Sequence, residues 1–179
     1  MTIPNLLSLL RLCLVPVFAV VFFLPDPNAH GFAALTYLGA FLTDIADGWI
    51  ARHFHQITRL GRILDPLADK LMTFTVIICI TVDDIIPLWA VMVFFCKELT
   101  MAVGGYLMYR RLGDVISSNW LGKASTGVFF IVCVALILFP GIPASLATGL
   151  ISFALGLTLA ALASYVCQYR QALAKRKAA

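Results

Sequence analysis

The sequence predicts an all-α polytopic membrane protein, and three observations lead to this fold class. Hydrophobic residues make up 61% of the 179-residue chain, charged residues only 12%, and the mean hydropathy is +0.97. Soluble domains are far less apolar than this. The apolar residues also fall in runs of about 20, the length that crosses a bilayer as a helix. Finally, most of the charges lie between these runs. We expect one domain over residues 1–179.

The apolar runs predict six transmembrane helices. Their expected ranges are 4–24, 31–50, 63–82, 86–109, 124–140 and 144–167. The first is not interpreted as a cleaved signal, because it lacks a basic beginning and a small-residue cleavage site. The five cysteines stand singly, without a CxxC or Cys/His spacing, and this indicates packing residues rather than zinc ligands.

The distribution of Lys and Arg predicts the orientation. The connections at 25–30, 83–86 and 140–145 contain neither residue, whereas the intervening connections and the C-terminal tail are cationic. These cations are Arg52, Arg59, Arg62, Arg110, Arg111, Lys123, Arg170, Lys175, Arg176 and Lys177. Because cytoplasmic loops carry the excess of Lys and Arg, both termini are expected in the cytoplasm. The net charge of +4 then favours attraction to anionic membrane lipids. Nucleic-acid binding is not predicted, because the sequence has no basic face outside the loops and tail.

Four of the nine acidic residues lie in one short and otherwise largely apolar stretch. Asp44 and Asp47 are three residues apart, and Asp65 and Asp69 are four apart, so each pair projects from one face of a helix. A carboxylate at membrane depth is costly unless it is paired or binds a metal. Hard oxygen donors on two facing helices suit Mg²⁺, Mn²⁺ or Ca²⁺. The sequence therefore predicts a metal site, on the cytoplasmic side.

The same stretch carries a longer motif. Residues 44–69 read D-x2-D-G-x2-A-R-x8-G-x3-D-x3-D, which fixes eight positions over 26 residues. The pattern resembles, at every position, the signature of the CDP-alcohol phosphatidyltransferases. This resemblance implies one domain of that family, six transmembrane helices, a homodimer and a cytoplasm-facing site in a bacterial inner (plasma) membrane. It also implies transfer of a phosphatidyl group from CDP-diacylglycerol to an alcohol, with release of CMP.

The resemblance implies a role for each motif position. Asp44, Asp47 and Asp65 look like metal ligands, and Asp69 looks like the catalytic base and a further metal contact. The CDP-lipid pocket is expected at Asp44, Gly48, Arg52, Thr58 and Gly61. Two ions of Mg²⁺ or Mn²⁺ would neutralise the pyrophosphate and stabilise the departing CMP. A carboxylate beside them can accept the proton of the attacking hydroxyl.

Two further similarities bear on the acceptor alcohol. The opening IPNLLSLLR, residues 3–11, resembles the N-terminus of phosphatidylglycerophosphate synthases and of cardiolipin synthases. Phosphatidylglycerophosphate synthases also show Arg-Glu where this chain has Lys97-Glu98, and Gly-Lys-x-Lys-Thr where it has Gly-Lys-Ala-Ser-Thr at 122–126. The expected acceptor is glycerol 3-phosphate. Its phosphate is expected to be held by Lys97, Arg110, Arg111 and Lys123.

Several alternatives stay open at this stage. The same chemistry would serve phosphatidylglycerol, giving cardiolipin, or an inositol phosphate, whereas choline or ethanolamine would favour acidic or aromatic groups. Lys97 and Glu98 could be a charge-compensating pair, and the loop cations could be topology anchors. Arg11 is expected to reach the headgroup layer, where it could bind a phosphate or a lipid. An ion- or proton-coupled transporter also uses intramembrane carboxylates, but it would not require the glycines and Arg52 at these spacings.

Overall fold

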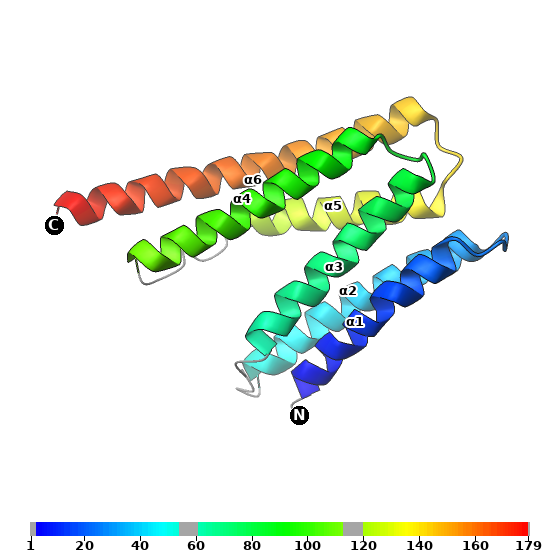
Figure 1. The fold of residues 1–179 in the computed structure, drawn as a ribbon, viewed down its shortest axis with the longest axis horizontal. Coiled ribbons are helices and arrows are strands. Elements are labelled where there is room, and N and C mark those ends of the chain that lie inside the picture. The colour runs from blue at the N-terminus through cyan, green and yellow to red at the C-terminus, as the bar shows by residue number, and fades with distance from the viewer. Residues whose placement is uncertain (1–2, 54–60, 113–119, 179) are drawn as a thin grey trace. The chain divides into compact units, whose positions relative to one another are not determined.

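Six α-helices form the part of the chain that the computed structural model describes, residues 3–53, 61–112 and 120–178 (Figure 1). They are α1 (Ile3–Phe22), α2 (Ala29–His53), α3 (Gly61–Val82), α4 (Leu88–Leu112), α5 (Trp120–Leu138) and α6 (Ala144–Ala178). The predicted all-α class and the order of the helices are confirmed. Most observed ends lie within a few residues of the predicted ones. The exception is α6, which continues past residue 167 because its tail is rich in Ala, Gln, Lys and Arg, all strong helix formers.

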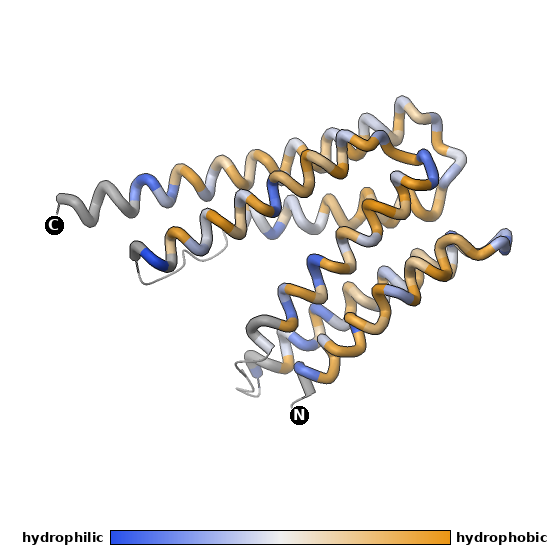
Figure 2. The backbone as a smooth tube through the Cα atoms, in the orientation of Figure 1, coloured by the Kyte–Doolittle hydropathy of each residue, from blue (hydrophilic) through white to orange (hydrophobic). Residues whose placement is uncertain are grey.

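Four of the described helices are long and apolar enough to cross a membrane, which makes this an integral membrane protein. The candidate spans are Asn5–Phe22, Leu88–Met108, Trp120–Leu138 and Ala144–Gln171, in α1, α4, α5 and α6. At 25 and 22 residues, α2 and α3 are also long enough. Hydrophilic residues interrupt both of them, however, toward the end at which α1 begins (Figure 2). Six spans therefore stay a prediction.

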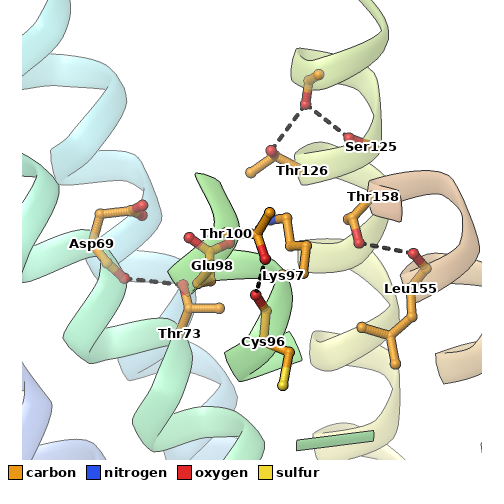
Figure 3. Close-up of polar contacts among 11 residues, drawn as sticks. Asp69, Thr73, Cys96, Lys97, Glu98, Thr100, Ser125, Thr126, Leu155 and Thr158 are labelled. Carbon is orange, nitrogen blue, oxygen red and sulfur yellow. Dashed lines mark hydrogen bonds and ion pairs between the residues drawn. The ribbon is translucent and has the colours of Figure 1, made fainter. Parts of the chain in front are cut away.

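Large apolar side chains face outward along these helices. Leu35 on α2 is 63% exposed, Leu88 on α4 is 68% exposed and Ile131 on α5 is 65% exposed. Such exposure is costly in water and favourable in lipid. Several threonine hydroxyl groups are satisfied within their own helix. Thr73, Thr100 and Thr126 each donate to the carbonyl four residues earlier, at 2.7–3.0 Å (Figure 3).

By its packing, the chain divides into two units. The first comprises Met1–Ile85 and Cys133–Ile142, and the second comprises Ile86–Val132 and Pro143–Ala179. The first unit holds α1, α2, α3 and the last turns of α5, and it contains the carboxylate motif. The second unit holds α4, most of α5 and α6. The prediction of one functional domain is not tested by this division.

In the first unit, α1, α2 and α3 run alternately up and down and pack on one another. The ring of Phe18 on α1 lies 6.2 Å from that of Tyr37 on α2, and the ring of Phe22 lies 4.8 Å from that of His30. His30 Nε2 in turn lies 4.0 Å from Asp83 Oδ2, just past α3. The end of α1, the start of α2 and the end of α3 therefore share one end of this unit. The start of α1, the end of α2 and the start of α3 share the other.

Short-range contacts determine where α2 starts and α3 ends. Before α2, the carboxylate of Asp26 accepts a hydrogen bond of 2.7 Å from the backbone N–H of Asn28. After α3, Asp84 adopts a left-handed backbone with φ of 56°, and the N–H of Ile85 donates to the carbonyl of Ile80 at 3.0 Å. Asp tolerates the left-handed conformation better than most residues. This conformation ends the helix, because it lets a following N–H donate to one of the last helical carbonyls.

In the second unit, α4 packs against α6, and α4 also contacts α5. The rings of Phe94 and Phe129 stack with their centroids 5.0 Å apart. On α6, Ala147, Ala154 and Ala161 are buried at intervals of seven residues. Small residues at such spacing let a neighbouring helix approach closely.

Candidate active site

A guanidinium on α1 lies between the two carboxylates of α2. Arg11 Nη1 is 2.6 Å from Asp44 Oδ1, and Nη2 donates a hydrogen bond to Asp47 Oδ2. Arg11 is 1% exposed and Asp47 is 3% exposed, while Asp44 remains partly accessible. Buried charges of this kind are held by pairing, because an isolated ion loses its hydration energy. The packing of α1 on α2 thus depends on this ion pair at the site end.

The neighbouring turn of α1 contacts the first carboxylate of α3. The hydroxyl of Ser8, which is fully buried, donates to Asp65 Oδ1. Ser8 and Arg11 are three residues apart and lie on the same side of α1. Asp44, Asp47 and Asp65 are therefore gathered on one face of α1, although they come from two helices. The expectation that the two acidic pairs face each other stays a prediction, because these contacts do not include the side chain of Asp69.

Asp69 lies one turn beyond Asp65 on α3. It is partly buried, and its backbone carbonyl accepts the hydroxyl hydrogen bond of Thr73 (Figure 3). The side chain of Thr73 also lies near that of Tyr37, which is 5% exposed on α2. The turn that carries Asp69 therefore lies next to α2.

The predicted CDP-lipid residues are only partly described. Gly48 lies near the end of α2 and is partly exposed, and Gly61 is the first residue of α3 and is buried. Both occur at the end of the first unit that contains the carboxylates. Arg52 belongs to α2, but its side chain lies outside the described part of the structure, and Thr58 lies outside the described residues altogether.

The predicted acceptor residues belong to the second unit. Lys97 Nζ pairs with the carboxylate of its neighbour Glu98, and both residues are drawn in Figure 3. Lys97 Nζ also lies 5.3 Å from the centre of the Phe94 ring. The charge-compensating pair considered above is thus formed. Arg110 at the end of α4 and Lys123 at the start of α5 are exposed, and the side chain of Arg111 is not among the described ones. The acceptor roles of these four residues stay predictions.

Two residues of α1 differ from expectation. Arg11 was expected to extend to the headgroup layer, but it turns inward because Asp44 and Asp47 provide partners that a buried guanidinium needs. Ser8 was missing from the candidate residues. The signal that would have found it is the spacing of Asn5, Ser8 and Arg11, three polar residues at intervals of three on an otherwise apolar helix, all of them buried.

The donor set at this end suits a divalent cation. Carboxylate oxygens are the ligands that Mg²⁺ and Mn²⁺ prefer, and these carboxylates already attract the one cation that α1 provides. Arg11 Nε is buried and has no hydrogen-bond partner among the described residues, so one N–H donor of the guanidinium is left unsatisfied there. As the side chains stand, no group of three or more His, Cys, Asp or Glu residues in the described ranges is arranged to hold a metal. The carboxylate oxygens therefore fit Mg²⁺ or Mn²⁺ by their chemistry, without being arranged as a complete site.

Paired carboxylates at one end of membrane helices suit an integral membrane enzyme or an ion-coupled transporter. Residues 1–164 match the family described as CDP-alcohol phosphatidyltransferase. The chain therefore belongs to the CDP-alcohol phosphatidyltransferase family and is a transferase of phospholipid biosynthesis. The transporter alternative is set aside on this ground.

Curated relatives fall into two groups. The chain is 33% identical over 148 residues to a CDP-diacylglycerol–glycerol-3-phosphate 3-phosphatidyltransferase of Bacillus subtilis strain 168, a match that covers 76% of each chain. It is 33% identical over 128 residues to a protein of the same name from Salmonella paratyphi A, covering 69% of this chain and 70% of that one. It is 36% identical over 129 residues to a cardiolipin synthase (CMP-forming) of Streptomyces coelicolor, covering 70% of this chain but only 60% of that one.

The contact between Ser8 and Asp65 generates a stability prediction. Ser8→Ala removes a buried donor from a partly buried carboxylate, and this should lower the free energy of unfolding by about 1–3 kcal/mol. Thermal or denaturant unfolding of the detergent-solubilised protein in EDTA measures the effect. Ser152→Ala is the matched control, because Ser152 is exposed and bonds only within its own helix; its change should stay within about 0.5 kcal/mol. Equal effects of the two substitutions would contradict the role given to Ser8.

Proposed function

We propose that the protein transfers the phosphatidyl group of CDP-diacylglycerol to glycerol 3-phosphate, giving phosphatidylglycerophosphate and CMP. The names of the Bacillus and Salmonella relatives support this choice of acceptor. The structural observation that carries the proposal is the meeting of Asp44, Asp47 and Asp65 on one face of α1. The motif glycines, Gly48 and Gly61, occur at the same end of the first unit.

Asp44, Asp47, Asp65 and Asp69 would hold one or two Mg²⁺ or Mn²⁺ ions. When bound, such ions neutralise the pyrophosphate and stabilise the charge on departing CMP. The carboxylates supply only hard oxygen donors, which suits these ions and disfavours zinc. Gly48 and Gly61 lack side chains and so leave room for the nucleotide to approach the backbone.

In the proposed reaction, the remaining residues orient the substrates and move one proton. Asp69 accepts the proton of the acceptor hydroxyl, whose oxygen attacks the lipid-side phosphorus in line with the CMP oxygen that leaves. Arg52 and Thr58 contact the CDP-lipid on the nucleotide side. No covalent enzyme intermediate is required, because direct transfer suffices and no Ser, Cys or His was identified as an activated nucleophile.

The acceptor phosphate would bind cations of the second unit, namely Lys97, Arg110, Arg111 and Lys123. Six spans with both termini in the cytoplasm would open the site to soluble glycerol 3-phosphate at the inner face of a bacterial plasma membrane. The cationic loops favour anionic lipids there. We also expect the protein to form a homodimer, as the family resemblance implies.

A second candidate acceptor is phosphatidylglycerol, which would give cardiolipin. The observation that favours it is the 36% identity to the Streptomyces cardiolipin synthase. The donor half of the reaction would be unchanged, because the carboxylates act on the CDP-lipid. The two candidates differ only in whether the attacking hydroxyl belongs to a soluble phosphate ester or to a lipid.

Metal removal tests the carboxylate site. Activity should vanish in EDTA and return with Mg²⁺ or Mn²⁺, and Asp44→Ala, Asp47→Ala and Asp65→Ala should each abolish both metal binding and CMP release. Asp83→Ala is the control, since this exposed carboxylate lies at the other end of the first unit. CMP release from CDP-diacylglycerol measures turnover. Full activity in EDTA, or in any of the three variants, would remove the metal from the proposal.

The role of Asp69 is tested by a nearly isosteric change. Asp69→Asn cannot accept a proton, so kcat should fall by roughly 10²-fold or more, the usual scale for a lost general base. Binding of the CDP-lipid should change much less, whereas Asp26→Asn, which alters an exposed loop carboxylate, should leave kcat near that of the wild type. Steady-state kinetics and a binding assay distinguish these effects. A parallel loss of binding and turnover would mean that Asp69 acts mainly as a metal ligand.

The acceptor is tested by a panel of alcohols and by removing charges. Glycerol 3-phosphate should be used in preference to phosphatidylglycerol, inositol phosphate and neutral alcohols. Lys97→Ala and Lys123→Ala should raise KM for glycerol 3-phosphate by about 10- to 150-fold, because a charge-assisted contact contributes about 1.5–3 kcal/mol. The KM for CDP-diacylglycerol should stay near normal, and Arg52→Ala should show the opposite selectivity.

Arg170→Ala provides the control for this series, because it removes an exposed cation of α6 that is not among the proposed acceptor residues. If the enzyme prefers phosphatidylglycerol in the panel, phosphatidylglycerol is the acceptor and the proposal of glycerol 3-phosphate is wrong. The protein would still be a phosphatidyltransferase. Unchanged KM values in both lysine variants would remove these lysines from the acceptor site.

A further inference from the structure

The buried guanidinium of Arg11 is the feature of the site that the proposed reaction does not use. Three polar residues of α1, Asn5, Ser8 and Arg11, are at most 8% exposed. Arg11 alone among them carries a charge, and it pairs with two carboxylates proposed to bind metal. A residue that only anchored the helix at the membrane surface would extend toward the headgroups instead.

The geometry of the ion pair is incomplete in a specific way. Nη2 makes a hydrogen bond to Asp47, but Nη1, although 2.6 Å from Asp44 Oδ1, has no aligned hydrogen bond, and Nε has no partner among the described residues. Arginine offers five N–H donors in a rigid fork, and buried donors are normally satisfied. Arg11 is thus held by charge more than by its hydrogen bonds.

The two oxygens next to Arg11 belong to the carboxylates that would bind a divalent ion. A guanidinium and a divalent cation at such short range repel each other, and the repulsion is strong where water is excluded. A carboxylate that pairs with Arg11 also offers fewer lone pairs to a metal. Arg11 and the ion therefore compete for Asp44 and Asp47.

We infer that Arg11 is a built-in counter-cation of the metal site. It neutralises Asp44 and Asp47 and keeps them positioned when no divalent ion is bound, and it gives up these ion pairs when an ion binds. Arg11 is a positioning residue in this scheme, and it lowers the affinity for metal while it stabilises the metal-free protein. The inference rests on the proposed metal site and adds to it the residue that sets the affinity.

Metal binding to the purified full-length protein, without substrate, tests this role. Arg11→Met keeps an unbranched side chain and removes the charge. It should bind Mn²⁺ about 10-fold or more tightly than the wild type, because the competing cation is gone. Free Mn²⁺ counted by its electron paramagnetic resonance signal gives the affinities. Tm in EDTA should fall below the wild-type value, and saturating Mn²⁺ should restore most of the difference.

Lys70→Met is the matched control, because it removes the same charge from an exposed residue that follows Asp69 on α3. Its Mn²⁺ affinity should differ from that of the wild type by less than about 2-fold, as expected for a solvent-screened charge. Arg11→Gln serves if Arg11→Met does not fold. It removes the charge but keeps N–H donors for the carboxylates, and it should also bind Mn²⁺ more tightly than the wild type.

The outcomes distinguish a failure of the proposed metal site from a failure of the role given to Arg11. A wild-type protein that binds Mn²⁺, together with Arg11 variants that bind it equally or less tightly, overturns the inference and leaves the metal site in place. A wild-type protein that binds no Mn²⁺ overturns the proposed metal site and the inference with it. The inference would also be overturned if Lys70→Met bound Mn²⁺ as tightly as Arg11→Met does. The gain in affinity would then reflect net charge alone.

Discussion

Burial of carboxylates among apolar helices is the constraint on which the site end of this protein depends. Asp47 is 3% exposed, and an ionised group there is stable only if opposite charge or hydrogen-bond donors replace the water it has lost. Arg11 provides both to Asp47, and Ser8 on the same face of α1 donates a hydrogen bond to Asp65. Because the two residues are three apart, a single helix face contacts both α2 and α3. Buried polar contacts therefore contribute to the packing of these helices at this end.

The opposite end of the first unit is organised differently. There the aromatic rings of Phe18 and Phe22 on α1 pack against Tyr37 and His30 on α2. Along α1, polar contacts in the first turns give way to apolar contacts in the last turns. This division suits an enzyme whose substrate is amphipathic, because a CDP-linked lipid carries its pyrophosphate at the membrane surface and its acyl chains in the bilayer. The polar end is where the proposed chemistry occurs.

Much of this arrangement could be predicted from the sequence, for identifiable reasons. Helices were predictable because apolar runs of membrane length leave few alternatives, and the carboxylate pairs were predictable because Asp is rare and costly in such runs. The inward turn of Arg11 was not predictable from hydropathy, which gives the polarity of a residue but not its partner. Ser8 was missed because an isolated serine is tolerated in a membrane helix. The length of α6 was underestimated because hydropathy marks where lipid ends, whereas helix propensity determines where the helix ends.

The charge balance at the site accounts for the cation it is proposed to bind. Asp44, Asp47, Asp65 and Asp69 bring four carboxylates to one end of the unit, and Arg11 offsets one of these charges. The pyrophosphate of a CDP-linked lipid is itself anionic, so it would be repelled from this end of the helices. Divalent ions held by these carboxylates would reverse the sign of the local field, as bound cations do in other phosphate sites. With such ions bound, the carboxylates of the proposed site would take part in holding an acidic substrate instead of repelling it.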